Sequence, residues 1–192
     1  HLFYPPGYPV AIALQYLFCR DAEFAAHGVS LLAYLSTIML TASLAWRLRR
    51  SPMFILAATA GVTLHPYNLL YASYALSEAL FAAAVLASAL CAWRLATEKH
   101  PPLRLWAAWG VLGGYAYLIR ADGILYFPLQ AVFVGWLRQR DGRARYWKFG
   151  FSGILFFAVM FPYLLLIKQE TGAWQLSTKT PILLEFARGK ML

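Results

Sequence analysis

The sequence predicts an all-α protein: a polytopic transmembrane helical bundle with about six crossings and one short helix at the outer membrane interface. Of the 192 residues, 61% are apolar and 13% are charged. Soluble globular domains carry about 25% charged residues, so this chain has too few to cover a water-facing surface. Long uncharged runs also alternate with clusters of Arg and Lys, as is typical of membrane helices and their cytoplasmic loops. The composition excludes intrinsic disorder and argues against a soluble α/β enzyme.

The first half of the chain supplies three predicted crossings. Residues 29–46 form an uncharged run that ends at a cluster of arginines. The next uncharged stretch contains His65-Pro66, and the apolar run after Glu78 ends at Arg94. Because a crossing needs only about 20 residues, the segment is too long for one helix. We expect two crossings, at 53–70 and 76–93, that reverse at 71–75.

The second half of the chain predicts three more crossings. The apolar runs 105–119 and 123–137 are separated by Arg120 and Asp122, and both outer flanks of the pair are basic. Basic flanks favour the cytoplasm, so a hairpin with Arg120 and Asp122 at its outer tip fits better than one long helix. The last crossing covers 149–167, and we expect Pro162 to kink its outer end.

The distribution of basic residues sets the expected orientation. The predicted cytoplasmic loops, 47–52, 94–104 and 138–148, hold eleven of the 17 basic residues and two of the eight acidic ones. The net charge of +9 therefore lies on one face, where it also meets anionic lipid head groups, and indicates no nucleic-acid partner. The predicted non-cytoplasmic segments are 1–28, 71–75, 120–122 and 168–192. We expect an integral membrane protein of the prokaryotic plasma (inner) membrane.

Residues 5–18 form an apolar run that is short for a crossing. With the first crossing directed from outside to inside, residues 1–28 lie wholly outside, and 5–18 would form a helix along the outer interface. The alternative is a seventh, short crossing that places the N-terminus inside. Five tryptophans fall at predicted interfacial levels, as in an aromatic belt: Trp46, Trp93, Trp106, Trp136 and Trp147.

Charged and polar groups gather at the predicted outer ends of the helices, and charges near membrane spans are where function is sought. Glu78 begins a long apolar helix, where it is either a capping carboxylate or a ligand for substrate or metal. Arg120 either pairs with Asp122 or holds an anionic group such as a phosphate. His65, beside Pro66, is either a hydrogen-bonded structural residue or a ligand.

Two further residues belong to the same predicted outer layer, His1 and Tyr4.

The sequence contains no Walker loop and no GxSxG, HExxH or CxxC motif, which disfavours an ATP-driven pump, a serine hydrolase and a zincin. Cys19 and Cys91 lie in apolar surroundings and are predicted to be packing residues.

Four segments, in order, resemble the polytopic glycosyltransferases of the GT-C type, in the branch of protein O-mannosyltransferases and the lipid A aminoarabinose transferase. Tyr4-Pro5-Pro6-Gly7-Tyr8-Pro9 is similar to the PPxYP segment of these enzymes. His65-Pro66 through Tyr71-Ala72-Ser73, and then Ser77-Glu78-Ala79-Leu80-Phe81, resemble the branch's third crossing, outer turn and following helix. Leu118-Ile119-Arg120-Ala121-Asp122-Gly123 resembles its LxRPEG corner, with Ala121 and Asp122 in place of Pro and Glu.

The resemblance implies an inverting transferase that moves a sugar from a polyprenyl-phosphate donor to an acceptor on the non-cytoplasmic face. It implies a catalytic role for Glu78, which is also the expected ligand of a divalent metal ion, and a lipid-phosphate contact for Arg120. By the same resemblance the substrate site would include His65, Asp122, His1 and Tyr4.

We expect residues 1–192 to form one transmembrane glycosyltransferase domain, incomplete at both ends. The resemblance implies that an outer-loop carboxylate precedes the PPxYP segment, and we expect that loop to lie before His1. A lipid-linked-sugar flippase or transporter is the alternative function, and a membrane scaffold whose outer charges are only caps and pairs is a third.

Overall fold

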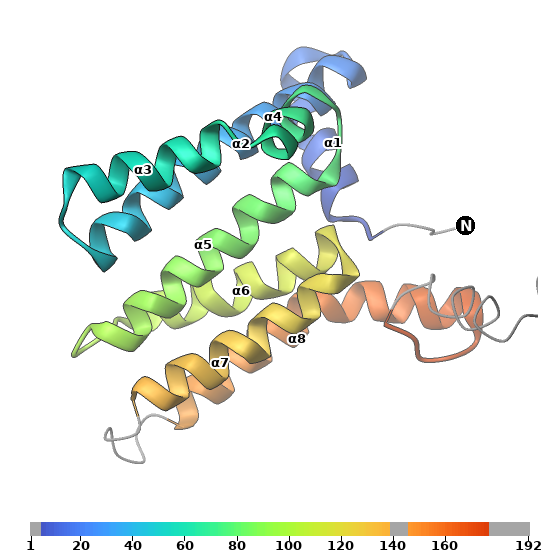
Figure 1. The fold of residues 1–192 in the computed structure, drawn as a ribbon. Helices are drawn as coiled ribbons and strands as arrows, with labels where there is room; N and C mark the ends of the chain where they lie inside the picture. The colour runs from blue at the N-terminus through green and yellow to red at the C-terminus, as the bar shows by residue number, and fades with distance from the viewer. Residues whose placement is uncertain (1–4, 139–145, 177–192) are drawn as a thin grey trace, which may run out of the picture.

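The computed structural model describes residues 5–138 and 146–176, and all regular structure in them is helical (Figure 1). The predicted all-α class is therefore confirmed for this part of the chain. The helices are α1 (Gly7–Cys19), α2 (Ala22–Leu48), α3 (Pro52–Thr63), α4 (Pro66–Ser73), α5 (Ser77–Thr97), α6 (Leu103–Ile119), the short 3-10 helix η1 (Ala121–Leu125), α7 (Tyr126–Leu137) and α8 (Tyr146–Thr171).

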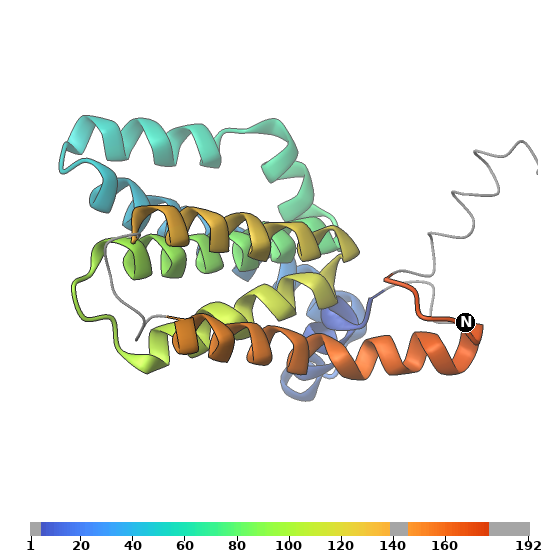
Figure 2. The same cartoon turned by 90° about the horizontal axis from the view of Figure 1, so that it is seen from below.

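The long helices run back and forth along one common direction. In Figure 1, α2, α5 and α7 end on the left, where α3, α6 and α8 begin. The start of α5, the end of α6 and the start of α7 lie together at the opposite end. Seen from below, α3 and α8 lie on opposite sides, with α5, α7 and α6 between them (Figure 2). The arginine-bearing end of α2 and the Glu78–Arg120 end of the bundle are thus well separated.

In the described part of the chain, three helices are long and apolar enough to cross a membrane: α2, α5 and α8, with 27, 21 and 26 residues. A fourth is present if α3 and α4, which are bent by 54° at their break, form one span. The predicted crossings 105–119 and 123–137 fall on α6 and on η1–α7, which have 17 residues or fewer each. At 1.5 Å per residue, 17 residues span about 25 Å, less than a hydrocarbon core of about 30 Å. The count of six crossings stays a prediction.

Local sequence explains where helix boundaries differ from those expected. The first long helix begins at Ala22 instead of residue 29, because the Asp21 side chain accepts a hydrogen bond from the Phe24 amide at 3.0 Å and caps it. The expected crossing at 53–70 is divided into α3 and α4 because Pro66 lacks an amide hydrogen and favours an extended residue before it. Residues 7–19 do form a separate helix, α1, and its interfacial location stays a prediction.

The main core lies along α6, which packs between α5 and α8. Trp106 and Trp109 are fully buried there, with Phe127, Phe156 and Tyr163 around them. The Trp106 side chain, one of the five in the predicted aromatic belt, has no solvent-accessible surface and fills a helix–helix contact, and its interfacial level stays a prediction. Trp46, Trp136 and Trp147, in contrast, expose more than half of their surface.

A polar contact inside the bundle joins three helices. Ser88 of α5 donates a hydrogen bond to Gln130 Oε1 of α7 at 2.7 Å, and the Trp109 indole of α6 donates to the same oxygen at 2.8 Å. In a membrane such contacts fix the rotation of helices about their axes, since a polar side chain has no other partner in hydrocarbon.

Gly110 allows α6 to approach α8 closely, and this predicts a selective effect of Gly110→Ala. A Cβ at this position would lie 2.3 Å from the Ser152 carbonyl oxygen, a backbone atom that cannot move independently. We expect Gly110→Ala to lower the free energy of unfolding by about 1–3 kcal/mol through overpacking. The matched control is Gly135→Ala in α7, where a Cβ meets nothing within 4 Å.

Thermal unfolding of the detergent-solubilised protein measures both effects. Gly135→Ala should leave the transition unchanged or raise it, because alanine favours a helix by about 1 kcal/mol over glycine. Equal behaviour of the two variants would contradict a tight α6–α8 contact at Gly110.

Candidate functional site

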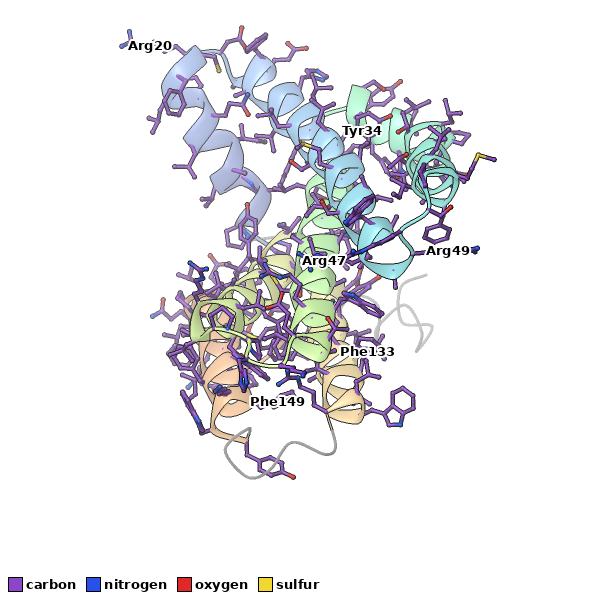
Figure 3. The ribbon with its side chains drawn as sticks, turned by 90° about the vertical axis from the view of Figure 1, so that its left-hand side faces the viewer. Arg20, Tyr34, Arg47, Arg49, Phe133 and Phe149 are labelled. Atoms are coloured by element: carbon purple, nitrogen blue, oxygen red, sulfur yellow. The ribbon has the colours of Figure 1, made fainter. Side chains whose placement is uncertain are left out.

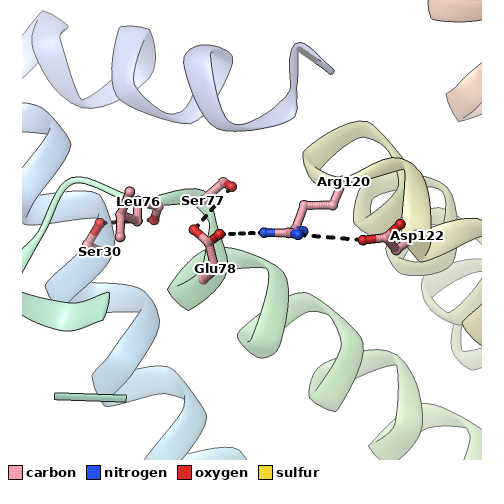
Figure 4. A network of polar contacts seen from close by, with 6 residues as sticks. All are labelled: Ser30, Leu76, Ser77, Glu78, Arg120 and Asp122. Atoms are coloured by element: carbon pink, nitrogen blue, oxygen red, sulfur yellow. Dashed lines mark hydrogen bonds and ion pairs between the residues drawn. The ribbon is translucent and has the colours of Figure 1, made fainter. Parts of the chain in front are cut away.

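The candidate site is built around an ion pair between Glu78 and Arg120 (Figure 4). Glu78 lies in the first turn of α5, and Arg120 is the residue that ends α6. Arg120 Nη1 donates to Glu78 Oε1 at 2.5 Å. The side chains are 34% exposed for Arg120 and 31% for Glu78, so the pair is partly buried and still accessible to solvent. The amide dipoles at the start of α5 also stabilise the carboxylate.

Arg120 has two further neighbours. Its Nη2 lies 3.5 Å from Asp122 Oδ2, and the Asp122 side chain is 70% exposed. The guanidinium carbon lies 5.8 Å from the centre of the Phe81 ring, one helical turn after Glu78. The guanidinium therefore lies between two carboxylates of unequal accessibility, with an aromatic ring beside it. Asp122 is the partner that a competing anion would displace more easily, because its contact is longer and more exposed.

The proline-rich segment at the start of α1 packs against the end of α6. A Cβ on Gly7 would lie 2.6 Å from the Leu118 carbonyl carbon and oxygen, so only glycine permits this approach. The Tyr115 hydroxyl donates a hydrogen bond to the Gly7 carbonyl oxygen at 3.3 Å. The last turn of α6, and with it the position of Arg120, is braced by α1.

A second set of contacts braces the start of α5. The Tyr8 hydroxyl lies 3.2 Å from Ser30 Oγ of α2, and Ser30 donates to the Leu76 carbonyl oxygen at 3.4 Å. Leu76 is the N-cap residue of α5, two positions before Glu78. Burial raises the pKa of Tyr8, the hydrogen bond with Ser30 opposes this shift, and the negative charge of Glu78 adds to it. The Tyr8 hydroxyl is thus a neutral hydrogen-bonding group near the carboxylate.

The structure brings together three of the six residues predicted for the site. Glu78, Arg120 and Asp122 form the ion-pair network, and Arg120 makes both its predicted pair with Asp122 and a shorter one with Glu78. His65 lies at the α3–α4 break, with its ring centre 5.9 Å from that of Tyr67. The contacts of the described residues do not join His65 to the network. His1 and Tyr4 lie outside the described residues.

Sequence analysis missed Tyr8, Ser30 and Phe81 as parts of this site. Tyr8 and Phe81 lie inside the segments that resemble the glycosyltransferases, so the motifs contained a signal for them. Ser30 had none, because one serine within an apolar run does not reveal which neighbour it faces.

A metal role for Glu78 has no support from neighbouring ligands. Within residues 5–138 and 146–176, no group of three or more His, Cys, Asp or Glu side chains lies close enough to hold a metal ion. Glu78 Oε1 is instead occupied by the Arg120 guanidinium, a cation that would repel a metal ion there. The divalent ion stays a prediction from the resemblance, and no chemical step is derived through it.

Comparisons of the chain with protein-family models, with curated proteins and with solved structures give no match. The resemblance to GT-C glycosyltransferases rests on the four sequence segments.

Tyr8→Phe tests the contact that braces α5. Loss of the hydroxyl removes its contact with Ser30, which keeps its hydrogen bond to Leu76, and we expect the free energy of unfolding to fall by about 1 kcal/mol. Because burial raises the pKa of Tyr8 above 10.0, the unfolded chain loses this proton first as the pH rises. The difference between wild type and Tyr8→Phe should therefore be constant below pH 10 and shrink above it.

Tyr16→Phe is the matched control, because Tyr16 lies on the same helix and is 44% exposed. Chemical denaturation of both variants in detergent across the pH range gives the comparison. A Tyr8→Phe variant as stable as Tyr16→Phe would contradict a bracing role.

Proposed function

We propose that this chain is part of an integral-membrane glycosyltransferase of the GT-C type, which moves a sugar from a polyprenyl-phosphate donor to an acceptor on the non-cytoplasmic face. The observation that carries the proposal is the Glu78–Arg120–Asp122 network. Two of the resembling segments supply its three residues, and a third segment braces it through Gly7 and Tyr8. Three segments that resemble one family, and that occur in the same order in the sequence, therefore also lie close together in the folded chain.

The network contains the groups that the transfer reaction needs. In the reaction an acceptor oxygen attacks the anomeric carbon, the bond from that carbon to the phosphate oxygen breaks, and its electron pair leaves with the phosphate. Arg120 would bind the polyprenyl phosphate and stabilise this charge, since its planar fork matches phosphate oxygens. Glu78 would accept the proton of the acceptor hydroxyl.

The two contacts of Arg120 suggest an order of events. A donor phosphate would first replace Asp122, whose contact is long and exposed, and would then share the guanidinium with Glu78. Weakening of the Glu78 contact would leave its carboxylate available to the acceptor hydroxyl. In this proposal His65, His1 and Tyr4 line the substrate site, an assignment that rests on the resemblance.

The proposed location is the prokaryotic plasma membrane, with about six crossings and the site at the non-cytoplasmic surface. The arginine-rich ends of the helices support this orientation, because basic residues favour the cytoplasmic side. The bilayer itself and the lipid-linked sugar donor are the proposed partners.

One observation favours the second candidate, a flippase for lipid-linked sugars. The α3–α4 pair is broken and bent by 54°, and discontinuous helices are typical of transporters. Transporter sites generally lie near the bilayer midplane. Glu78 is at the start of α5 and Arg120 at the end of α6, and these two helix ends lie together at one end of the bundle (Figure 1).

Substitutions at the ion pair separate these functions. In the intact protein we expect Glu78→Gln to lower sugar transfer from a polyprenyl donor about 10²–10⁴-fold, through loss of the proton acceptor. Arg120→Ala should lower it about 10²–10³-fold, because the leaving phosphate loses its cation. Initial rates with a radiolabelled donor in proteoliposomes give both values.

The Arg94–Glu98 pair provides the matched control, with a 2.7 Å contact, similar exposure and a position at the opposite end of the bundle. Glu98→Gln and Arg94→Ala should transfer sugar at nearly the wild-type rate. Normal transfer in Glu78→Gln and Arg120→Ala at wild-type expression would refute the site. Movement of labelled lipid across vesicles without any transfer would favour the flippase.

A further inference from the structure

Two adjoining cavities lie at the end of the bundle opposite the Glu78–Arg120 pair. The first, of about 740 Å³, lies between α2, α3 and α5 and is lined by Trp46, Arg47, Arg50 and Ile55. The second, of about 590 Å³, lies between α2, α5 and α7 and is lined by residues such as Leu44, Leu48 and Phe133. Trp93 of α5 lines both, so one side chain forms a shared wall.

The first cavity is basic. Arg47 and Arg50 line it together with neutral side chains, and its lining includes no carboxylate. Among the ion pairs of the described residues, neither arginine has a carboxylate partner, whereas Arg94 on the neighbouring α5 is paired with Glu98 at 2.7 Å. No carboxylate in the lining neutralises the positive charge of these two arginines. The cavity therefore suits a phosphate group.

The second cavity is apolar. Its lining has no charged side chain, and its one amide, Gln130, already accepts hydrogen bonds from Ser88 and Trp109. The ring of Trp93 stacks on Phe133 with centres 6.2 Å apart and planes inclined by 20°. This cavity has the chemistry of a site for a hydrocarbon chain.

The basic and apolar cavities are adjacent on the surface of α2. Leu44 and Arg47 are three residues apart, and residues with this spacing are neighbours on a helix. In Figure 3, Arg47 lies over the bundle above Phe133, whereas Arg49 extends away at the edge of the molecule. A ligand with an anionic head and an apolar chain could occupy both cavities at once.

We propose that an anionic phospholipid of the cytoplasmic leaflet binds here, with its phosphate at Arg47 and Arg50 and one acyl chain between α2, α5 and α7. Charge complementarity argues for this occupant, because the predicted orientation places the arginines at the head-group level of the leaflet that carries anionic lipids. The site does not depend on the proposed transferase activity, since none of its residues contacts Glu78 or Arg120 in the described contacts. If basic loops were attracted to anionic lipids only in a general way, Arg47 and Arg49 would contribute equally to lipid binding. A defined site requires a larger contribution from Arg47.

Matched arginine variants of the intact protein provide the test, with native mass spectrometry of lipid binding in detergent. The probes are phosphatidylglycerol and phosphatidylcholine. We expect Arg47→Gln to weaken phosphatidylglycerol binding about fivefold, the effect of one arginine near an anionic head group. Arg49→Gln removes the same charge two residues away and should leave binding unchanged.

Ala89→Phe tests the acyl-chain cavity, which Ala89 lines, without changing any charge. It should also weaken phosphatidylglycerol binding, and the Arg47 comparison decides alone if this variant does not fold. Three results would overturn the proposal: equal losses in Arg47→Gln and Arg49→Gln, unchanged binding in a folded Ala89→Phe, or equal binding of phosphatidylcholine. Full displacement of the lipid by millimolar inorganic phosphate would also overturn it, since that indicates an anion site without a chain site.

Discussion

The cost of charge in hydrocarbon is the constraint on which the arrangement of this bundle depends. Among the described residues, the ion pairs lie at helix ends: Arg94 with Glu98 at the end of α5, and Glu78 with Arg120 at the start of α5 and the end of α6. Inside the bundle, the polar side chain of Gln130 is bonded to two other helices. Sorting charges to the two ends creates two chemically different surfaces, one rich in arginine and one in which carboxylates and a guanidinium meet.

The second surface is positioned by packing as well as by charge. Arg120 ends a helix whose buried face is fixed against α8 by Trp106, Trp109 and Gly110. Its partner Glu78 begins a helix whose first turn is tied to α1 and α2 through Tyr8 and Ser30. Rigid elements and supporting hydrogen bonds hold these side chains in a fixed geometry, which the proposed transferase would need in order to position its substrates.

Sequence patterns predicted the class of fold and the gathering of Glu78, Arg120 and Asp122, because both follow from where charge interrupts apolar runs. They did not predict the burial of Trp106 or the Gln130 contact. Both depend on the rotation of each helix about its axis, and helices that are apolar all round give little periodic signal for it. In the sequence, the bend between α3 and α4 is indicated only by Pro66 within an uncharged run. A proline indicates where a helix breaks, but it does not give the angle between the two parts.

In the proposed orientation, the arginine-rich end and the Glu78–Arg120 end face opposite sides of the membrane. Single-cysteine accessibility tests it most directly, with Lys99→Cys and Tyr74→Cys placed separately in a Cys19→Ser, Cys91→Ala background. Both positions lie in exposed connections, at opposite ends of α5. We predict that a membrane-impermeant maleimide labels position 74 only from the outside of intact cells and position 99 only in inverted vesicles. Labelling of both positions from the same side would contradict the placement of the two ends on opposite sides of the membrane.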